Sequence, residues 1–148
     1  MNIGRAHQHR GSRTEAKVVS ELLDRGISVC TPVFGHERHD SIIDRSGTLE
    51  RVQVKTAHDH HGRNDTIVIE FDTTVYGSDG SPRRTFYSAE EIDSYLAYHP
   101  EDDVILYVPF EDTPRTQMNF SFRDAEEYNE HNRKAINFVS DYRLDVRL

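Results

Sequence analysis

The sequence contains one cysteine, no tryptophan and no long hydrophobic segment. A single cysteine excludes an internal disulfide and a cysteine-rich zinc site. The longest apolar runs are a few residues, such as 104–108, so no transmembrane segment is expected. The N-terminus lacks the apolar stretch of a signal peptide. These absences predict a cytoplasmic, intracellular protein with no membrane partner, and 148 residues is the length of one domain.

Basic residues are scarce in one half of the chain, and lysine is scarce throughout. Residues 1–84 carry 12 acids and 12 bases, whereas residues 85–148 carry 14 acids and 6 bases, which gives a net charge of −8. Such a chain cannot be basic over its whole surface, but it can present one basic edge to nucleic acid. The bases are 15 arginines and 3 lysines, a composition typical of a salt-adapted proteome, as in haloarchaea or their viruses.

Hydrophobic spacing predicts an α/β (α+β) domain with one central sheet. A flexible basic arm over residues 1–11 precedes a single domain over residues 12–148. A helix begins at Ser12 and ends at Gly26, and a second helix covers residues 124–135. A loop covers residues 77–82. Strands are predicted at 27–34, 41–43, 52–54, 66–71, 95–98, 104–109 and 118–122.

One predicted hairpin brings three polar residues to the same face of the sheet. If residues 46–47 form a two-residue loop, Asp40 lies directly opposite Gln53, with β-carbons about 5 Å apart. Lys55 lies two residues further along that face. A four-residue loop keeps this register, whereas a three-residue loop shifts it by one and separates the residues. Each residue alone is typical of a turn or a solvated strand, but the three together favour a functional site.

This set of side chains fits the hydrolysis of a phosphodiester bond. The reaction needs a hard cation at the phosphate oxygens, an activated water and relief of charge on the leaving oxygen. Mg²⁺ prefers oxygen ligands and keeps several waters, so one or two carboxylates suffice. A lysine near the phosphate orients the water and offsets negative charge. We therefore predict that Asp40, Gln53 and Lys55 are catalytic.

Glu15 is a fourth candidate, on the predicted first helix. It falls on the helical stripe formed by Val18, Val19, Leu22 and Leu23. As part of the pattern Ser12-x-x-Glu15, it fits a capping box that closes the helix N-terminus. As an inward-facing carboxylate, it fits an active-site acid. Both interpretations stay open at the level of sequence.

With these residues in view, the chain resembles the PD-(D/E)XK nucleases. The resemblance rests on Glu15, on residues 39–44 (His-Asp-Ser-Ile-Ile-Asp) and on residues 52–56 (Val-Gln-Val-Lys-Thr). Two groups are especially similar: the group I intron homing endonucleases with a restriction-enzyme fold, and the archaeal Holliday junction resolvases. Residues 91–93 and 107–109 also resemble the first group.

The resemblance implies a restriction-endonuclease-like fold, with a central mixed sheet flanked by helices, and Mg²⁺-dependent cleavage of DNA, with Mn²⁺ as a substitute. By position, Asp40, Gln53 and the backbone carbonyl of Val54 would bind the metal, with Glu15 as an accessory ligand. Lys55 would position or activate water. The chain departs from the usual pattern at Gln53, where most members have Asp or Glu. A neutral amide is a weaker metal ligand, so lower affinity or fewer metals is expected.

Three functions stay open: a homing-type DNA endonuclease, a Holliday junction resolvase, and a non-catalytic DNA-binding module on the same fold. The DNA partner is accordingly duplex or branched, and paired active sites imply a homodimer or tetramer. Lys55→Ala separates an enzyme from a binding module, and four-way junctions separate the two enzymes.

Basic residues near these motifs are candidates for contact with DNA. They are Arg10, Arg13, Arg51, His58, Arg63, Arg83 and Arg84. The cluster His58, His60 and His61 could supply two zinc ligands. Nine histidines in a polar chain form such clusters by chance, so the sequence favours a loop at the DNA-facing edge.

Overall fold

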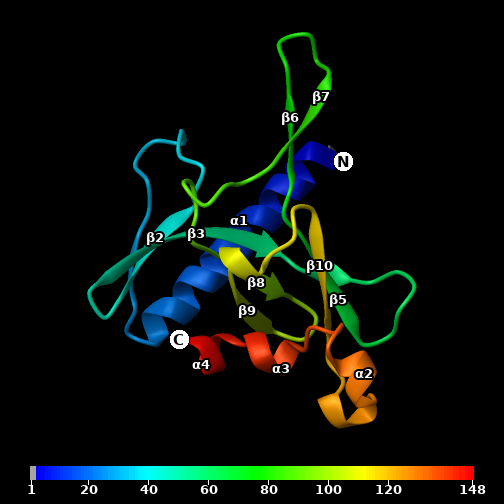
Figure 1. The fold of residues 1–148 in the computed structure, drawn as a ribbon. Coiled ribbons are helices and arrows are strands. Elements are labelled where there is room, and N and C mark those ends of the chain that lie inside the picture. The colour runs from blue at the N-terminus through cyan, green and yellow to red at the C-terminus, as the bar shows by residue number, and fades with distance from the viewer. Residues whose placement is uncertain (1–2) are drawn as a thin grey trace.

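The first helix begins earlier than the sequence predicts. The computed structural model describes residues 3–148, and α1 spans Ile3–Asp24 (Figure 1). Residues 3–11, where a flexible arm was expected, therefore form the first part of α1, and residues 1–2 of that arm lie outside the described residues. Because Ser12 lies inside the helix, it cannot cap the N-terminus, and the Ser12–Glu15 capping box is wrong. Gly26, with φ of 74°, follows the helix end as predicted.

A five-stranded mixed sheet forms the centre of the fold. Its order is β1-β2-β3-β8-β9, with β3 and β8 parallel and the other neighbours antiparallel. The strands are β1 (Ser28–Cys30), β2 (Ser41–Arg45), β3 (Thr48–Thr56), β8 (Ser94–His99) and β9 (Val104–Pro109). The mixed sheet confirms the predicted fold class. The strand predicted over residues 27–34 is shorter than expected, because only three residues pair with β2.

The two faces of the central sheet bury different cores. On one face Val18 and Leu22 of α1 pack against Val52 and Val54 of β3 and against Leu96. On the other face a second sheet covers the first, in the order β10-β5-β4. Its strands are β4 (His58–Asp59), β5 (Thr66–Glu70) and β10 (Gln117–Ser121). Since side chains alternate along a strand, Gln53 and Lys55 lie on the face opposite α1, in register with Tyr95 and Ala97.

A hairpin projects from the body where the sequence predicts only a loop. Strands β6 (Thr73–Tyr76) and β7 (Pro82–Thr85) pair with each other alone, and Figure 1 shows them extending away from both sheets. Asp79 stabilises the tip by accepting hydrogen bonds from the amide and hydroxyl of Ser81. The hairpin places Arg83 and Arg84 on an exposed arm.

The C-terminal segment contains short helices instead of the single helix predicted over residues 124–135. They are η1 (Phe110–Asp112), η2 (Ala125–Glu127), α2 (Glu130–Arg133), α3 (Val139–Tyr142) and α4 (Leu144–Arg147). Asn129 adopts extended backbone and caps α2 through its side chain, so a new helix starts where the predicted one would have continued. Phe138, Val139 and Leu144 are buried and hold this segment against the sheets.

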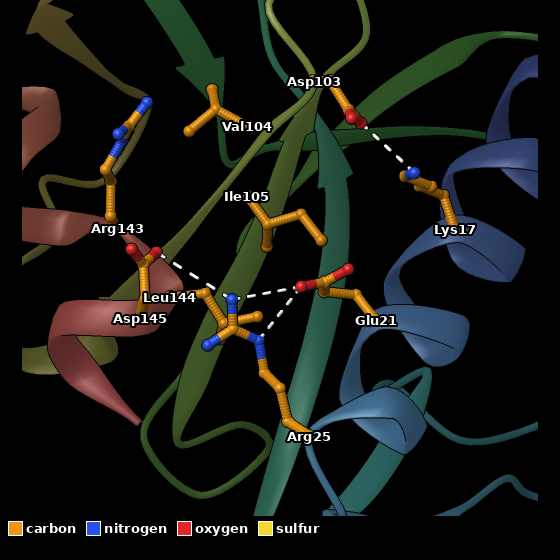
Figure 2. A pocket seen from close by; sticks show the side chains of 9 residues that line it. All are labelled: Lys17, Glu21, Arg25, Asp103, Val104, Ile105, Arg143, Leu144 and Asp145. Atoms are coloured by element: carbon orange, nitrogen blue, oxygen red, sulfur yellow. Dashed lines mark hydrogen bonds and ion pairs between the residues drawn. The ribbon is translucent and has the colours of Figure 1, made fainter.

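Ion pairs join the α1 region to the β8–β9 turn and to α4. In Figure 2, Arg25 lies between Glu21 and Asp145, at 3.1 and 3.9 Å, while Lys17 reaches Asp103 at 3.2 Å. The charged groups surround the buried Leu144. This pocket is filled with mutually paired charges and is a packing feature of the fold. No helix within residues 3–148 is both long and apolar enough to cross a membrane.

Candidate active site

The β2–β3 hairpin has the two-residue turn that sets the predicted register. Ser46 and Gly47 have φ values of 53° and 93°, as a tight hairpin of this hand requires, and Arg45 pairs with Thr48. Asp44 supports the turn by accepting a 2.7 Å hydrogen bond from the Gly47 amide. At the other end, the Asp40 amide donates to the Val52 carbonyl at 2.9 Å. The hydrogen bonds between β2 and β3 therefore place Asp40 beside β3, at the start of β2.

Asp40 turns its carboxylate onto the backbone of β3. Its Oδ2 accepts a 2.8 Å hydrogen bond from the Val54 amide. Burial raises the pKa of the Asp40 carboxyl, and this effect outweighs the lowering by the Val54 hydrogen bond and by the charges of Lys55 and His39. Asp40 is thus a half-buried carboxylate whose hydrogen bond and neighbouring positive charges do not fully offset the loss of hydration of its ionised form.

Gln53 has a buried polar atom without a protein partner. Its Oε1 accepts no hydrogen bond from any described group. A buried, unpaired carbonyl oxygen is costly, and in native proteins such a group usually meets water, an ion or a ligand. The amide of the next residue, Val54, points to the edge of β3 where Asp40 lies. Its carbonyl points to the same edge, at a position past the end of the β2–β3 pairing. These oxygens and the Asp40 carboxylate are a donor set that fits a hard divalent cation.

Lys55 is the half-buried amine of the group. Its Nζ lies 3.4 Å from the Thr73 hydroxyl and 5.1 Å from the centre of the Tyr87 ring. Burial lowers the pKa of Lys55, while the negative charges of Asp40 and Asp72 oppose that shift. The structure therefore brings Asp40 and Lys55 into one electrostatic environment, together with Gln53 and Val54.

Glu15 lies beside this group but not on the inward face of α1. The buried positions of the helix are Thr14, Val18 and Leu22, whereas Glu15 and Leu23 are exposed. Burial of part of the carboxyl group and repulsion from Asp40 nevertheless raise the pKa of Glu15. Glu15 is thus close enough to sense the Asp40 charge, and it reaches the site from the rim of the helix.

Several residues around Lys55 were not singled out from the sequence. Arg38 stacks over Tyr87 with its guanidinium carbon 4.5 Å from the ring centre, and it pairs with Glu91 at 2.8 Å. Tyr87 carries Arg38 and Lys55 on its ring, and its hydroxyl lies 3.2 Å from the Thr73 hydroxyl. These residues come from loops and from β6, and no sequence periodicity marks them.

Three of the predicted DNA-contacting residues meet in one cleft. Arg10 and Arg13 of α1 and His58 of β4 line a cavity of about 780 Å³, together with Lys17 and Thr56. Thr56 directly follows Lys55 in β3, but its side chain faces α1, so the cleft lies on the other face of the sheet from Lys55. Thr14 anchors this end of the helix through a 2.6 Å hydrogen bond to Thr56.

The other predicted contact residues lie elsewhere. Arg51 donates to Asp93 at 2.9 Å and to the Ala89 carbonyl at 3.0 Å, so its guanidinium is used inside the protein. Arg84 pairs with Asp72 at 2.7 Å. Arg63 and Arg83 are exposed, on a loop and on the projecting hairpin.

Comparison with known proteins identifies the family and the fold. The family model of the PD-(D/E)XK endonucleases matches residues 6–145. Among solved structures, the bacterial homing endonuclease I-Ssp6803I superposes with a TM-score of 0.71 at 18% sequence identity, over 95% of this chain and 93% of that one. At this identity, the likeness concerns the fold. No curated protein matches the sequence.

Proposed function

Because the chain belongs to the PD-(D/E)XK endonuclease family, we propose that it hydrolyses phosphodiester bonds in DNA with the aid of Mg²⁺. The observation that supports the proposal is that the Asp40 carboxylate bonds to β3 at Val54 and interacts with the charge of the half-buried Lys55, next to the unpaired oxygen of Gln53 in the same strand. The family assignment gives the reaction class, and these three groups give it a place in the molecule.

Asp40, Gln53 and the Val54 carbonyl would hold the ion, with Glu15 as an accessory carboxylate. When bound, Mg²⁺ supplies charge stabilisation at the phosphate oxygens, and Mn²⁺ can replace it. The raised pKa of Asp40 means that Lys55 and His39 only partly offset its burial, and the Gln53 oxygen has no partner among the described residues. Since Gln53 is neutral, the site has less negative charge than one built from two carboxylates, and we expect weak affinity for the metal.

Lys55 would orient and deprotonate the attacking water. Its lowered pKa increases the fraction of neutral amine at a given pH, so the amine can accept a proton. Thr73 and the Tyr87 ring hold the amine at the Asp40 end of the face. In its protonated form the same group would neutralise charge that develops on the phosphate.

The cleft lined by Arg10, Arg13 and His58 would bind the DNA backbone at the end of β3. Arg63 and the exposed Arg83 would extend this contact, whereas Arg51 and Arg84 are engaged in ion pairs and are not included. Cleavage of both DNA strands needs two active sites, so we expect a homodimer or tetramer.

Lys55→Ala is the direct test of the proposed function. We expect cleavage of DNA in Mg²⁺ or Mn²⁺ to fall by a factor of about 10³, as for loss of a general base, while DNA binding in Ca²⁺ is unchanged. Lys134→Ala, at an exposed lysine, is the matched control and should cleave like wild type. Linear duplex and four-way junction are compared as substrates. Preference for the junction would indicate a resolvase, and binding without cleavage by wild type would indicate a non-catalytic module.

A further inference from the structure

Three carboxylates surround one buried imidazole at the end of β8. The His99 side chain is 1% exposed. Its Nε2 lies 2.9 Å from an Asp59 oxygen and 3.2 Å from a Glu101 oxygen, while its Nδ1 lies 3.0 Å from an Asp102 oxygen. None of these residues belongs to the Asp40–Lys55 group or to the proposed reaction.

Hydrogen bonding alone does not account for this arrangement. A neutral imidazole has a single N–H, so one ring nitrogen must face a carboxylate with its lone pair. The nitrogen and carboxylate oxygens of Asp59, His99 and Glu101 all lie within 4.8 Å of one another, which places two negative groups side by side at one nitrogen. Among the described residues, Nδ1 has no hydrogen bond of good geometry. The ring is packed 5.9 Å from Phe122 and is held in this position.

We propose that Asp59, His99 and Glu101 bind a Zn²⁺ ion. One imidazole nitrogen and two carboxylate oxygens are a three-ligand zinc set, and a water completes four-coordination. The nitrogen donor favours zinc over Mg²⁺, which takes oxygen ligands. The Asp102 carboxylate lies 3.0 Å from Nδ1, so a proton on Nδ1 would face it and leave the Nε2 lone pair for the metal, the arrangement that typically orients a zinc-bound histidine.

The site lies where zinc can enter and where it would matter structurally. The Asp59 and Glu101 side chains are 71% and 68% exposed, so the ion reaches them from solvent and they can adjust to bonding distance. Asp59 belongs to β4 of the second sheet, whereas His99 ends β8 of the first sheet and Glu101 lies in the turn that follows it. The ion would therefore link the two sheets and neutralise the negative charge in the wall of the cleft that Asp59 and Glu101 share with Arg10 and Arg13.

Zinc binding to the full-length protein tests the proposal. Titration calorimetry and competition with a chromophoric chelator are run with Mg²⁺ in excess. We expect one Zn²⁺ per chain and a higher Tm on binding. The double variant Asp59→Asn/Glu101→Gln changes exposed side chains, so it should fold normally by circular dichroism and lose stoichiometric binding. Asp102→Asn should weaken affinity by about 10–100-fold.

Two controls locate the ion. His60→Gln/His61→Gln removes neighbouring histidines and should keep both stoichiometry and affinity. Asp40→Asn removes the carboxylate of the proposed Mg²⁺ site and should also keep zinc binding, so failure of the nuclease proposal and failure of this one are separable. Anomalous scattering at the zinc edge should give a peak within bonding distance, about 2 Å, of His99 Nε2. Absence of stoichiometric binding by wild type, or equal binding by the Asp59/Glu101 variant, would overturn the proposal.

Discussion

Two aspartates flank β3 on opposite edges and make similar backbone contacts in different environments. Asp40, on the β2 side, accepts a 2.8 Å hydrogen bond from the Val54 amide. Asp93, on the β8 side, accepts a 2.7 Å hydrogen bond from the Arg51 amide, and Arg51 also pairs with it through its guanidinium. The Arg51 hydrogen bond lowers the pKa of Asp93, whereas burial raises the pKa of Asp40.

The difference between these aspartates shows which carboxylate is available to a cation. An arginine that satisfies a carboxylate in two directions leaves it with little gain from a metal. Asp40 faces a lysine whose own charge is disfavoured by burial, and the neighbouring Gln53 oxygen has no partner. Because the protein supplies little positive charge at the Asp40 carboxylate, this site is suited to bind a cation from solution.

The largest expected effect is on cleavage, and it separates the two aspartates. Asp40→Asn removes the proposed metal carboxylate and should reduce DNA cleavage by a factor of about 10³. Asp93→Asn is the matched control and should retain cleavage within a few-fold, since its partner is Arg51. Initial rates in saturating Mg²⁺ provide the measurement. Equal losses in both variants would remove the distinction.

A second effect concerns the metal affinity of the Asp40 edge. Gln53→Glu adds a negative ligand at the unpaired oxygen and should lower the Mg²⁺ concentration for half-maximal cleavage by about tenfold. Glu111→Gln, at an exposed acid elsewhere, should leave that concentration unchanged. Mg²⁺ titrations of the cleavage rate compare the variants. An unchanged requirement in Gln53→Glu would place the ion away from this residue.

A third effect is on stability without metal, and its sign differs between the aspartates. At pH 7 Asp40→Asn should stabilise the protein by up to about 1 kcal/mol, because it removes a poorly compensated charge. Asp93→Asn should destabilise it by about 1 kcal/mol at most, since the side chain is 38% exposed and solvent screens the pair. Urea unfolding of both variants provides the comparison. A shared sign would contradict the assigned environments.

The smallest effect is the pH dependence of these stability differences. The pKa of Asp93 is lowered on folding, so its contribution is present above the unfolded value of about 3.9 and is lost as pH falls through the folded value. The pKa of Asp40 is raised on folding, so its cost to stability begins as pH rises through the unfolded value and is complete above the folded value. Both differences from wild type should therefore shrink on acidification, that of Asp40→Asn first. Chemical unfolding between pH 7 and 3 measures them, and a gain for Asp40→Asn that persists at pH 3 would be inconsistent with burial as its cause.

The sequence predicts the hairpin because its information is local. The turn at residues 46–47, the alternation in β3 and the Asp40–Gln53 alignment depend on a few consecutive residues and on the strand period. The paired strands β8 and β9 and the mixed sheet were also predicted, and the structure confirms them.

What the sequence does not predict depends on tertiary contacts. Whether Glu15 faces inward depends on where α1 begins and on Thr14 pairing with Thr56, which no helical periodicity contains. The β6–β7 strands have few apolar residues, so their pairing gives no hydrophobic pattern. Arg38, Thr73 and Tyr87 gather around Lys55 from three separate segments. Asp59, His99 and Glu101 likewise meet only when β4 and β8 are placed side by side.

A Mn²⁺-soaked crystal measured at the manganese edge tests the central claim most directly. Mn²⁺ stands in for Mg²⁺ and gives an anomalous signal. The account predicts a peak about 2.1 Å from an Asp40 carboxylate oxygen, with the Gln53 oxygen or the Val54 carbonyl also in the coordination sphere. A fully occupied Mn²⁺ ion elsewhere, with the Asp40 edge of β3 empty, would contradict it.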